Sequence, residues 1–402
     1  MKKTLLALAV LAAFTGAAQA ELTISGRASL GVSTYSATGS TVTPATNDLA
    51  ARTRIDDYSS RLRIAGQQDL GGGGRAFAVY EFGLSFDTGT ANGQAGTANS
   101  AAGFNGSRES HVGIGNDTLE LRIGRQNVYW TEGDLNQTGA NFTGKDTLTD
   151  MYNGGGGLVS ANVRQNNILL LQLNTSSGFA GSQIYWGPET IAEAAPGSPA
   201  AAAATNAAAM GFKINYDTKG AIHLMADYQK RSNISNAAND TTVPTATNTF
   251  DNTVWKVAAG YRYGTGSIVA LHYWNLKKEW TDSATNSAAA ITATAGGRQQ
   301  TGYGINLVQN FGNEFYGYLQ WGSSGSYTHT AGGTDLTASG TTGYSIGVRK
   351  NLDKSTAIFS SYGVLQNDTN GLLNLTGGSF NSGTAAAGSD PTYFLVGMSY
   401  NF

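Results

Sequence analysis

The 402-residue sequence contains no cysteine, which excludes disulfide bonds, thiolate nucleophiles and cysteine metal ligands. Charged residues make up only 13% of the chain, about half the share in soluble globular proteins. After residue 20 no run of 18 apolar residues occurs, so no transmembrane helix is predicted. The near balance of 25 basic and 27 acidic residues gives no sign of a nucleic-acid-binding surface.

The first twenty residues have the pattern of a secretory signal peptide. Lys2 and Lys3 form a basic start, residues 5–14 are apolar, and residues 18–20 (Ala-Gln-Ala) form a small-x-small cleavage site. An N-terminal membrane anchor is disfavoured, because the apolar stretch is too short to span a bilayer as a helix. We therefore predict a signal peptide over residues 1–20 and one mature domain over residues 21–402.

The mature chain is rich in glycine and aromatic residues, and its apolar residues recur at every second position. In the last segment Phe394, Val396 and Met398 alternate with polar or small residues. Because successive side chains of a strand point to opposite faces, this alternation predicts strands with one apolar and one polar face. Sixteen such segments can be identified. They are 22–35, 52–68, 75–86, 106–115, 118–127, 160–173, 179–187, 210–217, 221–231, 252–263, 267–280, 298–310, 314–327, 342–352, 355–367 and 391–402.

The connections between these segments alternate between short and long. Short ones such as residues 69–74 and 264–266 carry the glycine, asparagine and aspartate that tight turns need, whereas long ones run up to some thirty residues. Short periplasmic turns and long external loops are typical of outer-membrane barrels. A β-solenoid would show a repeat of fixed length, and none is found.

The predicted fold is all-β, a 16-stranded antiparallel transmembrane β-barrel. Hydrocarbon contains no water to satisfy backbone groups, so a spanning sheet must close on itself and leave no open edge. Sixteen strands leave an aqueous channel inside. We therefore expect the polar faces to line water and the apolar faces to contact outer-membrane lipids and lipopolysaccharide.

The charged residues of the predicted strands lie opposite apolar neighbours. An arginine or lysine facing lipid near the middle of a bilayer costs roughly 2–4 kcal/mol, so we place these residues in the lumen. The predicted basic wall of the pore constriction consists of Arg27, Arg61, Arg63, Arg122, Arg125 and Arg164. Of these, Arg125 breaks the alternation of its strand, which indicates a strand end or a bulge.

No catalytic set is recognisable in the sequence. The four histidines, His111, His223, His272 and His329, lie on different predicted strands or loops without metal-ligand spacing. We expect no enzyme activity, no cofactor and no metal site.

Several segments resemble the general porins of Gram-negative outer membranes, in their betaproteobacterial branch. They are residues 60–73 (SRLRIAGQQDLGGG), 76–81, 124–126 (GRQ), 164–168 (RQNNI) and the terminal Phe402 with its alternating aromatics. The resemblance implies a homotrimer of 16-stranded barrels in which loop three folds inward to form a constriction. It also implies that wall arginines face acidic groups on that loop, and that Phe402 is the signal read by the barrel-assembly machinery.

Loop three spans residues 128–160 of this chain. Its acids are expected to form the acidic side of the constriction, joined by one residue of the third predicted strand. These residues are Glu132, Asp134, Asp146 and Asp150 of the loop, and Glu81 of the strand.

The arginines outnumber the wall acids, which favours a moderate preference for anions. A water-filled channel for passive diffusion of small hydrophilic solutes and ions is the leading functional prediction. A substrate-specific channel for small anions, carboxylates or sugars is one alternative. A structural or adhesive surface barrel is the other.

Overall fold

The computed structural model describes residues 21–41, 48–84, 86, 104–128, 147–152, 164–175, 178–188, 208–217, 220–235, 249–264, 266–280, 297–329, 335, 337–371, 373, 375 and 387–402. Within these residues the chain forms one continuous sheet of eighteen strands and the short helix α2 (Thr147–Tyr152). No helix in this part of the chain is long and apolar enough to cross a membrane.

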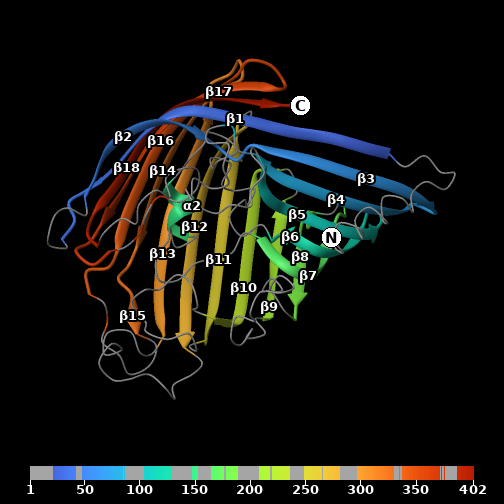
Figure 1. Ribbon diagram of the computed structural model, residues 1–402, viewed down its shortest axis with the longest axis horizontal. Coiled ribbons are helices and arrows are strands. Elements are labelled where there is room, and N and C mark those ends of the chain that lie inside the picture. Colours follow the sequence, from blue (N-terminus) through green and yellow to red (C-terminus); the bar gives the residue numbers. More distant parts are fainter. Residues whose placement is uncertain are drawn as a thin grey trace.

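The strands follow one another around the sheet in chain order (Figure 1). The first nine are β1 (Glu21–Thr38), β2 (Leu49–Asp57), β3 (Arg61–Gly71), β4 (Gly74–Leu84), β5 (Phe104–Gly115), β6 (Leu119–Asn127), β7 (Arg164–Leu173), β8 (Gln183–Gly187) and β9 (Ala208–Asp217). The other nine are β10 (Ile222–Ser235), β11 (Thr249–Tyr263), β12 (Ser267–Trp280), β13 (Arg298–Asn310), β14 (Phe315–Ser324), β15 (Thr328–His329), β16 (Thr341–Asn351), β17 (Thr356–Asn367) and β18 (Asp390–Asn401).

The eighteen strands amount to sixteen positions around a closed antiparallel barrel. Strands β2 and β3 are two halves of one barrel strand, because both pair with β1 along different parts of its length. In the same way β15 continues β14, since both pair with β13. The barrel closes where β1 pairs with β18 from Arg27↔Asn401 to Thr38↔Asp390. The predicted 16-stranded antiparallel fold is therefore confirmed.

The break between β2 and β3 has a local cause that alternation alone could not reveal. Ser59 has a positive φ of 63°, and the backbone N–H of Ser60 donates to the Asp57 carboxylate at 2.9 Å. This turn inserts an extra residue relative to β1. The strand consequently kinks immediately before Arg61.

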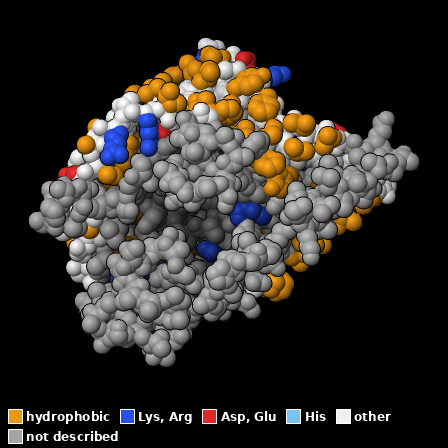
Figure 2. All heavy atoms as spheres, viewed as in Figure 1, with side chains coloured by type: hydrophobic (Ala, Val, Ile, Leu, Met, Phe, Trp, Pro, Cys, Tyr) orange, Lys and Arg blue, Asp and Glu red, His pale blue; other side chains and the backbone are white. Residues whose placement is uncertain are grey.

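The outer face of the barrel is apolar and the inner face is largely polar. On β13, Tyr303 is 54% exposed on the outside, whereas Asn306 and Gln300 are buried on the inside. On β18, Phe394 and Met398 are likewise exposed. Figure 2 shows hydrophobic side chains spread over the visible outer wall. Such an inside-out distribution matches a barrel surrounded by hydrocarbon.

One part of the interior is packed with apolar side chains, contrary to the expectation that the inner face is polar throughout. Inward-facing residues of β1, β11, β12, β17 and β18 form this cluster together with α2 and with residues of the connecting segments, such as Tyr58 and Tyr327. Its largest members are Tyr35, Tyr58, Trp274, Tyr327, Phe359 and Tyr393. The reason is that α2, a segment of loop three, fills this part of the barrel and needs an apolar surface to pack against.

The connection between β6 and β7 carries α2 across the barrel. Although β6 and β7 are neighbours, α2 contacts β12, β13, β14, β16 and β17 (Figure 1). Its Leu148 and Met151 are fully buried. The helical part of loop three therefore lies inside the barrel, against the wall opposite β3–β6.

Candidate functional site

The arginines predicted for the basic wall gather on one side of the interior. In the β1–β3 register Arg27 pairs with Arg61, and Arg63 pairs with Ser25 two positions further along. Because directly paired residues share a face, these arginines point to the same side of the sheet as the buried Ser29 and Ser33. We call the interior face of β1 and β3–β7 the basic wall.

Strands β6 and β7 add the remaining predicted arginines. Arg122 lies on the interior face of β6, the same face as the buried Glu120 and Gln126. At Arg125 the β6–β7 register shifts between Gly124 and Gln126, so the predicted irregularity is a β-bulge. The Arg125 guanidinium donates to the side-chain oxygen of Asn166.

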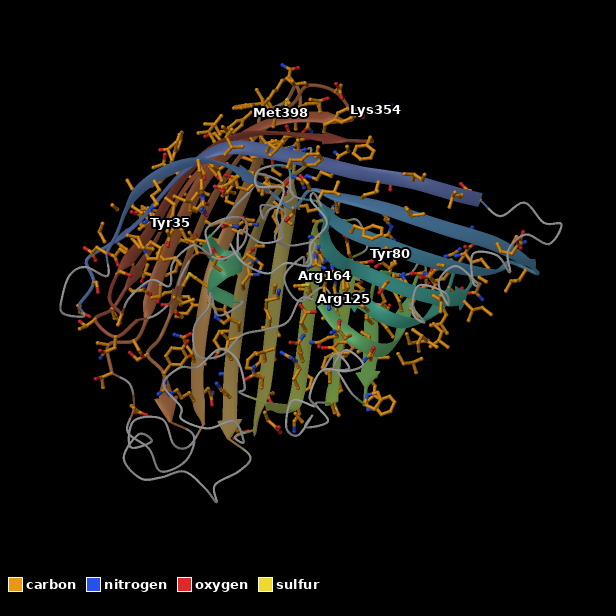
Figure 3. The ribbon with its side chains drawn as sticks, viewed as in Figure 1. Tyr35, Tyr80, Arg125, Arg164, Lys354 and Met398 are labelled. Carbon is orange, nitrogen blue, oxygen red and sulfur yellow. The ribbon has the colours of Figure 1, made fainter. Side chains whose placement is uncertain are left out.

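Arg164 begins β7, opposite Asn127, and lies beside Arg125 in Figure 3. Two arginines thus meet where the chain enters and leaves loop three.

The structure corrects the expected position of Glu81. The sequence prediction placed it with acids across the lumen from the arginines. Instead Glu81 lies on β4 within the basic wall, 2.7 Å from Arg108 and 3.6 Å from Arg63. The physical reason is that β4 is the hydrogen-bonded neighbour of β3, so Glu81 stands directly opposite Arg63.

Strand β5 contributes charged residues that the sequence analysis did not select. Glu109 pairs with Glu81 across β4 and β5 and lies 3.4 Å from Arg63. Arg108 sits at a register shift between β4 and β5, which allows it to reach the interior despite being next to Glu109. The two-residue alternation of β5 could have identified Glu109 as an interior residue. Arg108 reaches the interior only because of the bulge, which alternation in the sequence does not reveal.

A second charged group lies near the short-turn end of the same wall. Glu120 accepts from Arg75 at 2.6 Å and from the Nε of Arg122 at 2.9 Å, and Arg75 also reaches Asp117 at 2.9 Å. One carboxylate thus holds two guanidinium groups from β4 and β6. The sequence analysis selected Arg122 for the basic wall but did not identify Glu120 and Arg75 as its neighbours.

The predicted acidic side can be followed only in part. Glu132, Asp134 and Asp146 lie outside the described residues. Asp150 lies on α2 and is buried. This acid therefore belongs to the helix packed against the wall opposite the arginines.

The helix α2 has a seat made of interior glycines. A Cβ added at Gly322 would lie 3.0 Å from Leu148 Cδ1 and 3.2 Å from Met151 Sδ, and Gly304 has no room for a Cβ beside Leu148. The same holds at Gly343, where a Cβ would lie 2.8 Å from Met151 Sδ. The missing side chains let the helix approach the strands closely.

The first residue of α2 is held to this seat by a polar contact. The hydroxyl of Thr147 donates to Ser345 Oγ at 3.3 Å, and Ser345 donates to Gln320 at 2.9 Å. All three side chains are buried. A hydrogen-bonded chain thus links α2 to β16 and β14 beside the glycine seat.

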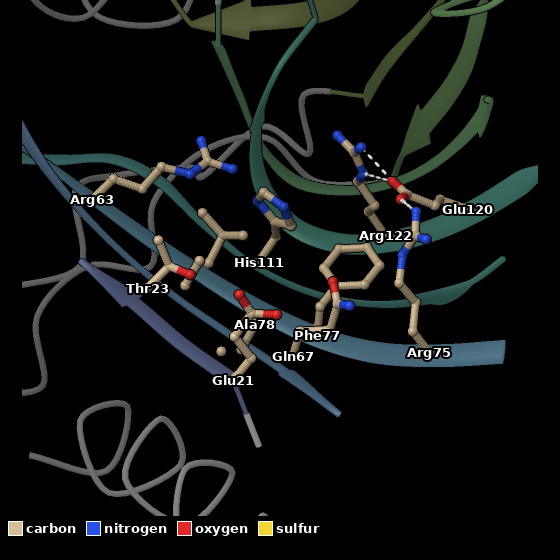
Figure 4. Close-up of a pocket in the computed structure, with 13 residues that line it drawn as sticks. Glu21, Thr23, Arg63, Gln67, Arg75, Phe77, Ala78, His111, Glu120 and Arg122 are labelled. Atoms are coloured by element: carbon tan, nitrogen blue, oxygen red, sulfur yellow. Dashed lines mark hydrogen bonds and ion pairs between the residues drawn. The ribbon is translucent and has the colours of Figure 1, made fainter. Parts of the chain in front are cut away.

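A pocket of about 290 Å³ opens in the basic wall toward the short-turn end. Its residues come from β1, β3, β4, β5 and β6 (Figure 4). Arg63 and Arg122 stand on either side of His111, and Phe77 lies below them. Basic groups, together with Glu21 and Glu120, therefore surround a partly apolar floor.

A separate buried ion pair lies on another part of the inner wall. Lys256 on β11 is 3.6 Å from Asp227 on β10, and both are almost fully buried. His272 on β12 is also buried. Among the residues that the structure describes, no group of three or more His, Asp or Glu could hold a metal ion.

Comparisons with known proteins find porins and other outer membrane proteins with the same architecture. The sequence profile described as Gram-negative porin matches residues 7–370. A comparison of the sequence with curated proteins finds no match. The fold is similar to that of an anion-selective porin from Comamonas acidovorans, with a TM-score of 0.67 and 19% identity over 96% of this chain and 100% of that one.

Two further solved structures show the same likeness. The trimer form of OmpT, an outer membrane protein of Vibrio cholerae, has a TM-score of 0.61 and 12% identity over 95% of this chain and 99% of that one. Salmonella typhi OmpF in complex with daunomycin has a TM-score of 0.56 and 14% identity over 95% and 97% of the two chains. At these identities the structural likeness establishes the barrel, while the profile match spans most of the sequence. The chain therefore belongs to the Gram-negative porin family and is a multi-pass β-barrel channel of the outer membrane.

Proposed function

We propose that this porin passes small hydrophilic solutes and ions by passive diffusion, with a preference for anions set by the basic wall. The observation that carries the proposal is the gathering of Arg27, Arg61, Arg63, Arg122 and Arg164 on one side of the interior. Charge of one sign in a confined lumen raises the local concentration of solutes of the opposite sign. The shared fold with an anion-selective porin supports the same assignment.

The glutamates of the wall reduce the positive field without cancelling it. Glu81 and Glu109 are shared among Arg63 and Arg108, and Glu120 is shared by Arg75 and Arg122. The arginines of β1 and β3–β7 named above outnumber these three glutamates, so a net positive charge remains on the basic wall. We therefore assign the selectivity to the arginines of the basic wall as a group.

We further propose that loop three narrows the passage between α2 and the basic wall. The position of α2 against β12–β17 supports this, because it reduces the open cross-section to the side where the arginines lie. In Figure 2, basic side chains are visible beside a central hollow. Glu132, Asp134, Asp146 and Asp150 stay proposed as the acidic side of this constriction.

The reversal potential across a planar bilayer under a KCl gradient tests the anion preference. The native channel should show chloride permeating faster than potassium. The double variant Arg61→Gln with Arg164→Gln should move the reversal potential toward zero. Lys354→Gln is the matched control, because Lys354 is exposed in the β16–β17 turn (Figure 3) and should leave the potential unchanged. Cation preference in the native channel would overturn the proposal.

The same recordings separate the alternative functions. Conductance proportional to salt concentration supports general diffusion, whereas conductance that saturates with one solute supports a substrate-specific channel. A purified barrel without single-channel conductance would instead support a structural or adhesive role. The proposed transport involves no catalytic step and no cofactor.

Maturation and assembly complete the proposal. We propose that residues 1–20 are removed as a signal peptide, which is supported by the cleavage pattern directly before β1. A homotrimer is supported by the trimer form of the structurally similar OmpT. Mass spectrometry of the purified protein should find Glu21 at the N-terminus, and unheated gel electrophoresis should show three times the monomer mass.

A further inference from the structure

The pocket in the basic wall is built in rows, because β3, β4, β5 and β6 pair in register. One row holds Gln67, Phe77, Gly113 and Arg122 as direct neighbours. The next row holds Ala65, Val79, His111 and Gly124. Beyond it lies the row of Arg63, Glu81 and Glu109, of which Arg63 lines the pocket. In the middle row Ala65 and Val79 thus form an apolar patch between Thr23 and His111, and the rows on either side carry guanidinium groups.

Arg63 is the guanidinium of this pocket that has the weakest ionic contacts. Its distances to Glu109 and Glu81 are 3.4 and 3.6 Å, and its side chain is 40% exposed. Arg75 and Arg122 are instead bound by Glu120 and are only 25% and 18% exposed. Of the three, Arg63 is therefore best placed to bind a carboxylate that enters from the lumen.

The floor beside Arg63 is apolar and partly aromatic. Ala65 and Val79 lie in the adjacent row, and Phe77 lies in the row after it. The Phe77 ring covers Gly113, which has no room for a Cβ, and Arg122 stands over the same ring at 5.9 Å. The ring is therefore held in place from two neighbouring strands.

The spacing of the rows matches a specific class of solute. Two residues along a strand correspond to about 6.6 Å, which is close to the length of a benzoate ion. A carboxylate on Arg63 would thus place an attached ring over Ala65 and Val79, with its edge toward Phe77. Offset or edge-to-face contact with Phe77 would be favourable.

We infer that this pocket is a binding subsite for small aromatic monocarboxylates such as benzoate. The inference rests on the proposed function, since it names a solute class for the same basic wall. A short acid such as acetate can reach Arg63 but leaves the apolar patch uncovered. Burying about 60 Å² of ring surface corresponds to about tenfold tighter binding of benzoate than of acetate.

Single-channel recordings in KCl with added benzoate or acetate test the subsite. Benzoate should reduce the chloride current with saturation, at a half-effective concentration about tenfold below that of acetate. Phe77→Leu removes the ring and should raise the benzoate value severalfold. Phe82→Leu is the matched control, because Phe82 lies on the outward-facing side of the same strand and should not change the benzoate value.

Arg63→Gln provides a second variant in case the Phe77 substitution impairs folding, and it should weaken benzoate and acetate alike. Equal effects of the two acids on the native channel would overturn the subsite. So would an unchanged benzoate value in both Phe77→Leu and Arg63→Gln. If the reversal potential shows anion preference while the two acids act equally, the subsite alone fails. If the native channel prefers cations, the proposed function fails instead.

Discussion

Arg27 and Arg61 lie directly opposite each other across the pairing of β1 with β3, and both belong to the interior face. Like charges in this arrangement are unfavourable for the stability of a sheet. The kink at Ser59 immediately precedes Arg61 and directs the strand into this pairing. The barrel thus keeps two like charges side by side on the proposed basic wall.

Replacing one arginine of this pair should change the stability of the barrel and the anion preference of the channel in opposite directions. Arg61→Gln relieves the repulsion, so we expect the folded barrel to keep its stability or gain about 0.2–1 kcal/mol. The same change should reduce the anion preference in KCl gradients. Thermal unfolding in detergent and the reversal potential measure the two effects. A loss of stability without a change in selectivity would show that Arg61 serves the fold alone.

The seat of α2 predicts a second separable effect. Gly304→Val adds a side chain where Leu148 packs, so it should displace α2 and cost about 1–3 kcal/mol. Because α2 belongs to loop three, single-channel conductance should change as well. Gly66→Ala is the control, since nothing lies within 4 Å of a Cβ added there. Unaltered conductance in Gly304→Val would contradict a role of α2 in bounding the passage.

Phe402, the last residue, takes part in closing the barrel and is also the residue expected to act as the assembly signal. The backbone of Phe402 exchanges two hydrogen bonds with Gly26, at 2.8 and 3.1 Å, and its ring lies 6.3 Å from that of Tyr400. Phe402→Ala keeps the backbone bonds but removes the ring. We expect far less protein in the outer membrane of cells, yet little change in refolding from urea into detergent.

Comparing those two measurements assigns the role of the Phe402 ring. Equal losses in cells and in detergent would mean that the ring acts in closure rather than as a signal. Tyr400→Ala removes the neighbouring exposed ring and indicates whether both aromatics contribute.

Acid should weaken one short turn. In the β16–β17 turn, Asp353 accepts hydrogen bonds from the backbone N–H groups of Ser355 at 2.6 Å and Thr356 at 2.8 Å. These bonds favour the carboxylate and lower the pKa of Asp353 below its usual value. Since the folded pKa lies below the unfolded one, the stabilisation is present at neutral pH and is lost as the pH falls through the lowered pKa.

Asp353→Asn isolates this charge, because the amide preserves the shape and one acceptor oxygen. The variant should be slightly less stable than the native protein at pH 7, and this difference should disappear as the pH falls through the lowered pKa of Asp353. The midpoint of unfolding in detergent at several pH values provides the measurement. If the difference in stability between the two proteins instead grew as the pH fell, the pKa of Asp353 would be raised on folding, contrary to this prediction.

Most of the strand layout could be predicted from the sequence. Segments such as β13 and β18 show this alternation, and the apolar residues by which they were identified, such as Tyr303, Phe394 and Met398, are exposed on the outer face. The predicted irregularity at Arg125 was also found. Alternation is informative here because each strand has hydrocarbon on one side and the barrel interior on the other.

The charge pairing within the site could be predicted only in part. Parity indicates that Arg63 and Arg122 face inward, but it does not reveal which carboxylates lie beside them. The placement of Glu81 among the arginines follows from the register of β3 with β4. The inward position of Arg108 depends on a register shift, which has no counterpart in local sequence.

The sequence by itself determined the closed barrel, its sixteen positions and its apolar exterior, since a two-residue period acts locally and recurs in every strand. Only the tertiary structure decided where loop three goes and which residues share the pocket. The seat of α2 is assembled from Gly304, Gly322 and Gly343 on three strands, and the pocket from residues of five strands. Contacts of this kind depend on register and closure, which bring together segments that are far apart along the chain.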